Sequence, residues 1–407
     1  GVRHIVSGSK AAFRIPLTTS LTASPSLDYT FTRSTAGTYI DSNGVIQTAA
    51  INEPRFQDGG LLVEPSATNL IPFSDNFIDN WVAAGVDRTA SAIDSPLGKL
   101  HGTMLRCTAT GQCLLYIQTA VCVPTISGST YTQSILAKAG TTNFVSITFG
   151  SATFSNLGYA VFDLANGVVN RQSNCTGWIK EVGDGWFRCF ITNTASTTGT
   201  QPYCIITPSR SGAARVQGVS GDSVYIDASQ TELGSPTSYI PTSGTTVTRT
   251  ADVLTYNVSD VITQGQGSLY CEFTLNGIQE SYYRLLYLSD GTTSNRIYVY
   301  GKENGGSVAS IVVTDGTTVV NLNSGVNVNG VGAVYKVLIT YTDDDVRLYV
   351  NGAFTAIDNS GTMPTISPAY LSVYNTYGGT NVANGIVKNV KYFSEALSEA
   401  EAVRLTS

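Results

Sequence analysis

Short runs of alternating apolar and polar residues make up most of the chain from residue 71 to its end. Side chains of a β-strand point alternately to opposite faces, so each run predicts a strand with one buried face. No long stretch has the 3.6-residue spacing that an amphipathic helix requires. The alternation is clearest in residues 335–352, where the apolar residues that share a face are Val337, Ile339 and Tyr341 on the first run and Val346, Leu348 and Val350 on the return. The pattern therefore predicts an all-β protein.

Glycine-containing turns separate these runs. Asn43-Gly44, Asn166-Gly167 and Asn351-Gly352 each stand between two strand-like segments. The Asn-Gly pair readily takes the positive φ angles of a two-residue hairpin turn, and Gly183-Asp184-Gly185 provides a similar break. Many short strands joined in this way are typical of a β-sandwich or jelly roll.

The predicted fold is two tandem jelly-roll β-sandwiches preceded by an extended N-terminal arm and a β-hairpin collar. At 407 residues, the chain is long enough for two or three domains. Residues 1–27 show neither helical nor alternating periodicity, and prolines interrupt the segment that follows them. We therefore predict these divisions along the chain: arm 1–27, collar 28–70, first sandwich 71–240, Pro- and Gly-containing linker 241–256 and second sandwich 257–407.

The last residues of the chain are the exception to the all-strand pattern. Ser398 is followed three residues later by Glu401, which is the spacing of a capping box at a helix N-terminus. Ala400, Ala402, Val403 and Leu405 then supply apolar positions. These residues predict a short helix that packs on the second sandwich.

Charge and hydropathy exclude several partners. Charged residues are 13% of the chain and the net charge is −6, which argues against nucleic acid as the main partner. No run of eighteen or more apolar residues appears, so no segment is expected to span a bilayer. The first seventeen residues lack the apolar core of a signal peptide.

Cysteine usage predicts free thiols. The seven cysteines include no close CxxC pair, and an odd number cannot complete a disulfide framework. Unpaired cysteine packs as a small apolar residue, so we expect buried thiols and folding in a reducing compartment.

Catalytic motifs are not found in the sequence. His4 and His101 are its only histidines, no serine lies in a GxSxG motif, and no GxxxxGK phosphate loop occurs. A glycosidase would need two carboxylates whose separation the sequence does not define. We therefore predict no enzymatic activity.

An acidic triplet is the candidate metal site. Asp343, Asp344 and Asp345 offer hard oxygen ligands for Ca²⁺, and no other cofactor is predicted. The simpler interpretation of the triplet is a solvated hairpin turn, because Asp clusters are common there.

Three segments carry a resemblance to a known group of proteins: TFTRSTAGTYIDSNGVIQTAAINEPRF…GLLVEPSATNLI, GDGWFRCFI and VYIDASQTELGSPTSYIPTSGTTVTRTADVL. They resemble tailed-bacteriophage virion proteins of the head-spike, head-fibre and tail-fibre kind. The resemblance implies a surface-displayed virion component and brings no catalytic residues with it.

Each predicted sandwich also resembles a known module. Residues 71–240 resemble jelly-roll carbohydrate-binding modules, in which aromatic rings on one sheet stack against sugars. The resemblance makes Tyr116, Tyr131, Tyr159, Trp178 and Trp186 candidate ligand-binding residues, although each is also explained as a core aromatic, Trp186 above all. The second sandwich, with its "VNG" strand end and closing helix, resembles laminin-G-like, concanavalin-type jelly rolls.

These observations lead to one main hypothesis and two alternatives. The main one is a bacteriophage virion protein, assembled in the host cytoplasm, that displays glycan-binding modules for adhesion to the host surface. Its N-terminal region would contact capsid or tail proteins, and phage fibres imply a homo-oligomer, commonly a trimer. The alternatives are a depolymerase that cleaves capsule or lipopolysaccharide, and a purely structural capsid decoration without a ligand.

Overall fold

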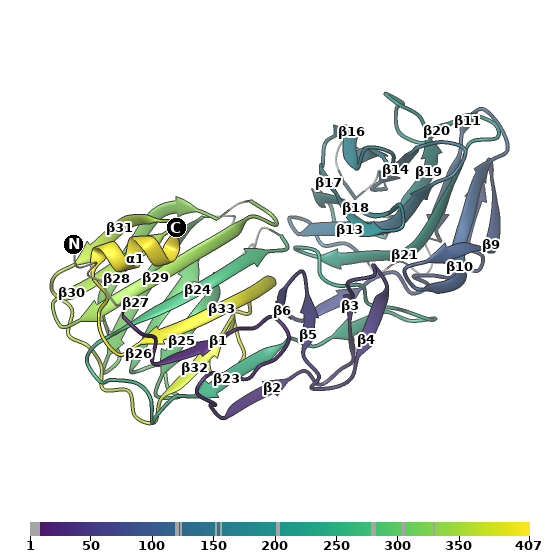
Figure 1. Cartoon of the computed structure of the whole chain (residues 1–407). Coiled ribbons are helices and arrows are strands. Elements are labelled where there is room, and N and C mark those ends of the chain that lie inside the picture. The colour runs from purple at the N-terminus through teal and green to yellow at the C-terminus, as the bar shows by residue number, and fades with distance from the viewer. Residues whose placement is uncertain are drawn as a thin grey trace, which may run out of the picture. The chain divides into compact units, whose positions relative to one another are not determined.

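The computed structural model describes residues 9–118, 122, 124–150, 153–154, 157–200, 204–277, 282–302, 306–328 and 330–407. Within them the chain is almost entirely strand, with one short helix, which confirms the predicted fold class. The chain divides into two compact units that interleave along the sequence (Figure 1). Residues up to 35, 50–65 and 250–407 form the unit that we call the C-terminal sandwich, and residues 36–49 and 66–249 form the central sandwich.

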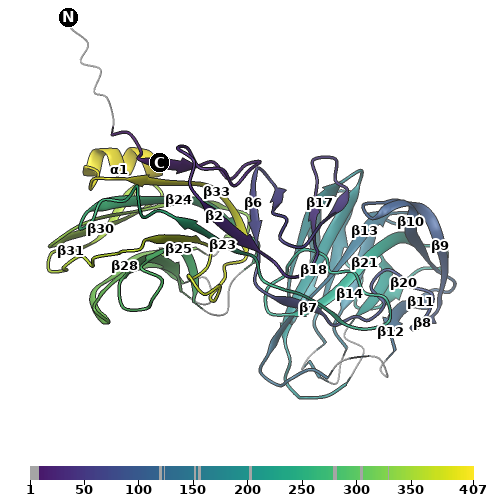
Figure 2. The ribbon, with the colours of Figure 1, turned by 90° about the horizontal axis from the view of Figure 1, so that it is seen from below.

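The C-terminal sandwich consists of two antiparallel sheets packed face to face (Figure 2). The first sheet has the order β31 (Ala353–Asp358), β30 (Asp345–Val350), β29 (Val334–Thr342), β24 (Gly267–Leu275), β33 (Gly385–Phe393), β6 (Gly60–Val63) and β5 (Arg55–Gln57), with β1 (Phe13–Ile15) also paired to β33. The second, which we call the tyrosine sheet, has the order β2 (Tyr29–Thr32), β23 (Val253–Asn257), β32 (Tyr370–Val373), β25 (Tyr283–Ser289), β26 (Arg296–Gly301), β27 (Ser307–Thr314) and β28 (Thr317–Asn327).

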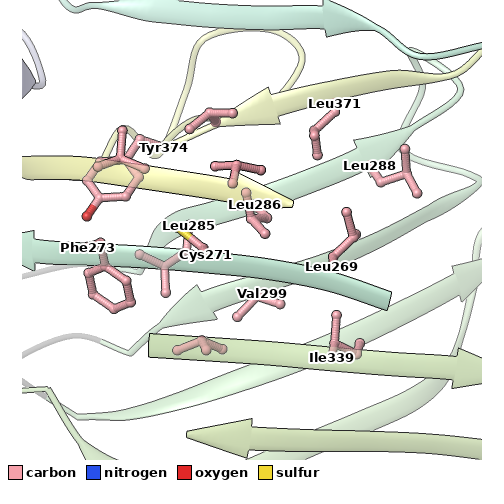
Figure 3. Close-up of a cluster of buried hydrophobic side chains, with 14 of the residues drawn as sticks. Leu269, Cys271, Phe273, Leu285, Leu286, Leu288, Val299, Ile339, Leu371 and Tyr374 are labelled. Atoms are coloured by element: carbon pink, nitrogen blue, oxygen red, sulfur yellow. The ribbon is translucent and has the colours of Figure 1, made fainter. Parts of the chain in front are cut away.

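Apolar residues from both sheets meet between the two layers. Leu269, Cys271 and Phe273 of β24 face leucines of β25 and Leu371 of β32, and all of them are buried (Figure 3). The alternation predicted for residues 335–352 is confirmed, because its six apolar residues all lie in this core. The aspartates form the turn, since Thr342 pairs with Asp345 across it.

The outer face of the first sheet is covered by α1 (Glu399–Thr406). Ala402 and Leu397 pack there with Tyr270, Tyr349 and other residues of the sheet. The backbone N–H of Ser398 donates to Oε2 of Glu401 at 3.3 Å, as the predicted capping box requires, and the Ser398 hydroxyl donates to the same oxygen at 2.7 Å. The outer face of the tyrosine sheet carries no helix from the described part of the chain (Figure 2).

The central sandwich also has two antiparallel six-stranded sheets. One, the β13 sheet, has the order β17 (Thr176–Gly183), β18 (Trp186–Thr194), β13 (Thr130–Ala139), β21 (Ser223–Leu233), β10 (Gly98–Cys107) and β9 (Val86–Ser95). The other, the β14 sheet, has the order β16 (Val168–Ser173), β15 (Tyr159–Asp163), β14 (Phe144–Thr148), β19 (Ile205–Ser209), β12 (Leu114–Ile117) and β8 (Trp81–Ala84).

Three two-stranded ribbons complete this unit. They are β3 (Gly37–Ile40) with β4 (Ile46–Ala49), β7 (Ala67–Asn69) with β22 (Val247–Arg249), and β11 (Gly111–Gln112) with β20 (Gln217–Gly218). The β3–β4 ribbon, whose turn is the predicted Asn43-Gly44, packs on the outer face of the β13 sheet: Ile40 and Ile46 contact the cluster of Leu136, Val182 and Trp186.

The observed units differ from the predicted divisions of the chain. Within the predicted arm, of which residues 1–8 lie outside the described residues, β1 pairs with β33, and Arg14 aligns with Lys391. The collar is shared between the two units, and the predicted linker supplies β22 and most of β23. The arm and the linker read as irregular because their short strands β1, β22 and β23 pair with strands that lie far away in the sequence.

The described residues agree with the prediction of free thiols. All seven cysteines are free, and each is buried except Cys175, which is half-buried. Among the described residues, no helix is long and apolar enough to cross a membrane.

Candidate functional site: an arginine pocket on the tyrosine sheet

The candidate site lies on the outer face of the tyrosine sheet, where strands β25 and β26 both contribute side chains to its lining. Ile297 and Val299 of β26 point into the core, so the residues that alternate with them along the strand point outward. These outward residues are Arg296, Tyr298 and Tyr300. The alternation of a single strand thus places an arginine and two tyrosines in one row.

Strand β25 contributes a second row because it contains a β-bulge. Its register to β26 shifts between Arg284 and Leu286. The shift lets Leu285 and Leu286, neighbours in sequence, both enter the core (Figure 3), and it leaves Arg284 on the outer face with Tyr287. Tyr287 lies directly opposite Tyr298, with ring centroids 5.5 Å apart.

Two loops, one after β25 and one after β32, lie beside these rows and complete the lining of a pocket. The loop after β32 is held to β25 because the N–H of Arg284 donates to the carbonyl of Asn381 at 2.9 Å. Its Tyr377 ring lies 4.6 Å from Tyr370. Gly291, in the loop after β25, has a φ of +88°, and a Cβ there would be in ordinary contact with both rings at about 3.5 Å. The left-handed backbone conformation, not the space, favours glycine at this position.

The resulting pocket has a volume of about 390 Å³, at the lower end of the range for small-ligand sites. Its lining combines three kinds of side chain: the arginines, two tyrosines, and polar residues of the loops, namely Thr292, Thr293, Thr376, Thr380 and Asn381. Tyr377 is 40% exposed, so part of its surface is accessible to a ligand. We call this site the arginine pocket.

Both guanidinium groups lie over Tyr298. The Cζ atom of Arg284 is 4.5 Å from its ring centroid and that of Arg296 is 5.6 Å away. Among the described residues that line the pocket, none is Asp or Glu. The Nε of Arg284 and the Nη1 of Arg296 are shut off from solvent and have no hydrogen-bond partner.

The electrostatics follow from this arrangement. Burial lowers the pKa of Arg284, the neighbouring charge of Arg296 lowers it further, and the surrounding tyrosines act in the opposite direction. Burial also raises the pKa of Tyr287, so that residue stays neutral. The pocket therefore holds positive charge that no carboxylate among its described lining residues balances.

Two of the five aromatic candidates predicted from the sequence are core residues. Tyr131 is 3% exposed and lies edge-on to Phe154, with its hydroxyl accepting from the N–H of Ile126. Trp186 is 1% exposed, and its Nε1–H donates to the carbonyl of Asp94 at 3.1 Å. Trp186 is on the outer face of its sheet, but the β3–β4 ribbon covers that face. Neither ring is available to a sugar.

Two other candidates share the outer face of the β14 sheet. The register places Tyr159 beside Thr148, Thr148 beside Ile205 and Ile205 beside Tyr116, so both tyrosines lie in one row. Tyr159 is buried, with the Cζ of Arg171 6.0 Å from its ring centroid, whereas Tyr116 is half-buried. The row offers less open aromatic surface than the arginine pocket.

The fifth candidate, Trp178, is engaged within its own sheet. Its ring is parallel to that of Phe190 at a centroid distance of 4.8 Å, and Arg188 lies over the same phenylalanine. Trp178 is half-buried, so only part of its ring surface is available to a ligand.

The acidic triplet does not form the expected metal site. Asp343 accepts from the N–H of Met363 at 2.7 Å, and Asp345 forms an ion pair with Arg347 at the same distance. Asp344, at φ +59°, is the second residue of the turn. Because a tight turn points successive side chains in different directions, the three carboxylates do not converge, and no group of three possible metal ligands occurs among the described residues.

His101 is close to a carboxylate and a serine but not in a catalytic arrangement. Its Nδ1 lies 2.9 Å from Oδ2 of Asp227, and the hydroxyl of Ser95 donates to the same oxygen at 2.5 Å. A nucleophilic serine would have to donate to the histidine, as in a Ser-His-Asp triad. The cluster therefore reads as a buried carboxylate satisfied by its neighbours.

Sequence reasoning missed Arg284 and Arg296 as site residues. The run NRIYVYG does carry a signal, because Arg296, Tyr298 and Tyr300 alternate with Ile297 and Val299. In contrast, strict alternation along YRLLYLS would place Arg284, Leu286 and Leu288 on one face. The sequence carries no recognisable signal for the β-bulge, which places Arg284 on the opposite face from Leu286 and Leu288.

Comparison with known proteins agrees with this fold. Residues 250–403 match the model of the concanavalin A-like lectin/glucanases superfamily, which confirms the predicted concanavalin-like character of the second sandwich. This match includes every residue that lines the arginine pocket. A search of curated proteins found no match.

Similar solved structures include two modules of carbohydrate-active enzymes and a pentraxin. The CBM40 module of Ruminococcus gnavus IT-sialidase, bound to alpha2,3 sialyllactose, is 18% identical (TM-score 0.33; 38% of this chain and 92% of that chain). Domain 4 of the GH43 arabinanase AbnA from Geobacillus stearothermophilus is 9% identical (TM-score 0.33; 43% and 82%). The SAP-like pentraxin of Limulus polyphemus is 14% identical (TM-score 0.30; 35% and 70%).

Proposed function

We propose that this chain is a non-catalytic glycan-binding protein of a tailed-bacteriophage virion, which holds the particle to sugars on the host surface. The arginine pocket is the observation that carries the glycan-binding part. Sugar rings stack their apolar faces on aromatic side chains, while their hydroxyls need polar partners. Tyr377 supplies a half-open ring, and the loop threonines and Asn381 supply the polar groups.

The virion part of the proposal is supported by the sequence segments that resemble phage head and tail fibres. The N-terminal region would attach to capsid or tail proteins, and the chain would assemble as a homo-oligomer, a trimer if it follows phage fibres. Free cysteines throughout the chain are consistent with assembly in the host cytoplasm.

Oligomerisation would matter for affinity. A shallow pocket for one or two sugar units binds weakly, because few contacts must offset the loss of ligand freedom. Several copies on one particle engage a polysaccharide together, and linking weak sites in this way raises the overall affinity by about 10²- to 10⁴-fold. Adhesion would therefore depend on the number of copies displayed.

The depolymerase alternative is less well supported by the pocket. Hydrolysis of a glycosidic bond normally uses two carboxylates on either side of that bond. The described residues that line the pocket include no Asp or Glu, whereas they do include groups suited to holding a sugar. A binding role therefore accounts for the lining better than hydrolysis does.

A glycan array tests the proposal. The wild-type protein should bind a subset of bacterial-surface glycans, and Tyr377→Ala should weaken that binding about tenfold, since a stacked aromatic ring contributes about 1 kcal/mol or more. Tyr29→Ala is the matched control, because Tyr29 is 48% exposed on the same sheet but is not part of the pocket. Its binding should equal that of the wild type.

Two results would redirect the proposal. Release of new reducing ends from host polysaccharide would favour the depolymerase. A blank array, with particles that still incorporate the protein, would favour a structural decoration without a ligand.

A further inference from the structure

We infer that the arginine pocket selects an acidic sugar, whose anionic group lies against Arg284 and Arg296. This inference rests on the proposed glycan binding and adds the chemical class of the ligand. It depends on the charge of the pocket, whereas the proposed function depends on its rings and hydroxyls. An experiment can therefore contradict the preference for acidic sugars without contradicting glycan binding.

The first support is that the pocket arginines have unused donors. Arg284 Nε and Arg296 Nη1 are buried and have no hydrogen-bond partner among the described residues. An unpaired buried donor is unfavourable, and more so when the group is charged. A side-chain rotation that brings either donor to the pocket lining would let a ligand oxygen accept from it.

The second support is the position of the two charges. Both guanidinium groups lie over the ring of Tyr298, so two like charges share one small site. The described lining residues supply no carboxylate to offset them, although the chain as a whole carries a net charge of −6. An anion between the two arginines would relieve their repulsion.

The third support is the chemistry of the donors. A guanidinium presents planar, paired N–H groups that match a carboxylate or a sulfate in a bidentate fashion. The side chains of Thr293 and Asn381 and the ring of Tyr377 lie in the same lining, where they could receive the rest of a sugar. Carboxylated sugars and sulfated sugars share this chemistry.

Arginine can also serve a structural purpose, because its apolar stem and guanidinium cover aromatic rings without any ligand. That role would keep the tyrosines covered but would not discriminate between charged and neutral sugars. The two roles therefore predict different behaviour in a binding experiment.

The experiment uses the full chain on an array of matched oligosaccharides. Each pair differs in one group: glucuronate or galacturonate against the neutral hexose, sialylated against unsialylated, and sulfated against unsulfated. We expect the acidic member of at least one pair to bind about tenfold or more tightly than its neutral partner, because hydrogen bonds to charged groups contribute about 1.5 to 3 kcal/mol. Raising the salt concentration should weaken this binding.

Arg284→Gln and Arg296→Gln should each reduce the affinity for the acidic glycan about tenfold or more. Arg14→Gln is the control, because it removes the same charge from an exposed position on the first sheet of the same sandwich. An unchanged melting temperature in all three variants shows that the fold is intact. Arg284→Lys provides a second variant, which keeps the charge but loses the paired donors and should bind with intermediate affinity.

The outcomes separate the two proposals. Binding to carboxylated glycans alone identifies a uronic or sialic type of sugar, and equal binding to sulfated glycans identifies any anionic sugar. Equal affinity for acidic and neutral partners, or unchanged binding by both glutamine variants, overturns this inference but leaves glycan binding standing. A blank array removes the proposed function and this inference together.

Discussion

Two pairs of arginines in the C-terminal sandwich have opposite surroundings. Arg33 and Arg55 are completely buried and reach Asp252, at 3.0 and 2.5 Å, and Arg55 also pairs with Glu64 at 2.8 Å. Arg284 and Arg296 are half-buried, lie over a tyrosine and contact no carboxylate of the described chain. The same residue type is thus neutralised at one place and left unbalanced at another.

The pKa shifts of Arg55 and Arg284 differ in sign for this reason. Burial by itself would lower the pKa of Arg55, but the charges of Asp252 and Glu64 outweigh burial and raise it. Arg284 lacks such partners, and burial lowers its pKa. A buried charge is normally paired within the fold. Arg284 and Arg296 are therefore the arginines that we expect to bind an anionic ligand.

The largest expected effect concerns the paired arginines. Asp252→Asn would leave Arg33 and Arg55 without their shared carboxylate in the interior. Removing one partner of a buried ion pair costs about 3 to 5 kcal/mol, which corresponds to a melting temperature lower by about 10 °C in a domain of this size. Differential scanning calorimetry of the full chain measures this change; a decrease below about 2 °C would show that the pairing contributes little.

A smaller effect on stability is expected at His101, which titrates beside the buried carboxylate of Asp227. The hydrogen bond to Asp227 raises the pKa of His101 above its ordinary 6.5, burial opposes this rise, and the charges of Asp227 and Asp75 add to it. The stabilisation from protonated His101 is therefore fully present below pH 6.5 and is lost as the pH rises through the folded-state pKa.

Asp227→Asn should return this pKa toward 6.5 and remove the pH dependence. Imidazole resonances in an NMR titration report it directly, and His4→Gln assigns them because the chain has two histidines. An unshifted pKa in the wild type would contradict the assignment.

The hydrogen bonds between Ser9 and Glu401 of α1 should contribute less to the stability of the fold. Glu401 accepts from the N–H and hydroxyl of Ser9, both at 2.9 Å, and from Ser398. These hydrogen bonds, led by that from the Ser9 N–H, lower the pKa of Glu401 to about 2. The stabilisation is therefore present above pH 4.5, the ordinary pKa, and is lost as the pH falls toward 2.

Glu401→Gln should lower the melting temperature by a few degrees at pH 7, in line with the loss of a helix cap worth about 1 kcal/mol. The difference between wild type and variant should shrink between pH 4.5 and 2. Thermal melts followed by circular dichroism at these pH values test it, and a difference that persisted at pH 2 would show that the charge of Glu401 is not responsible.

The smallest effect on stability is expected at the unbalanced arginines. Arg284→Gln combined with Arg296→Gln removes two like charges but also their contacts with Tyr298, so the two terms should nearly cancel. The melting temperature should stay within about 3 °C of the wild type, equivalent to about 1 kcal/mol. A drop as large as that of Asp252→Asn would mean that these arginines hold the fold together, and the contrast between the two pairs would disappear.

Much of each strand's inner face could be predicted from alternation. Residues 335–352 show this, because every apolar residue assigned to their inward faces lies in the core. The helix cap at Ser398 was equally predictable, because Glu401 lies only three residues away. Short-range patterns succeed where the partner is near in the sequence.

Burial of the outer faces could be predicted less well. Periodicity does not settle the position of Trp186, which is favoured as a core aromatic. Its burial depends on β9, whose Asp94 carbonyl accepts from its indole N–H, and on the cluster that the β3–β4 ribbon, about 140 residues earlier in the chain, packs against. The arm and linker contain short strands that read as irregular because their partners are remote. At the arginine pocket, alternation along β26 is enough to place Arg296, Tyr298 and Tyr300 on one face. The position of Arg284 on that face depends on the β-bulge, and therefore on the register between β25 and β26.

The sequence by itself determined the all-β class, the turns and the inward face of most strands, because these follow from side-chain period and local turn chemistry. Only the tertiary structure decided which outer faces stay open and which arginines find a carboxylate. The physical reason is distance along the chain: Arg33 and Arg55 are neutralised by Asp252, about 200 residues away, while Arg284 and Arg296 lie in a pocket whose described lining includes no acidic residue.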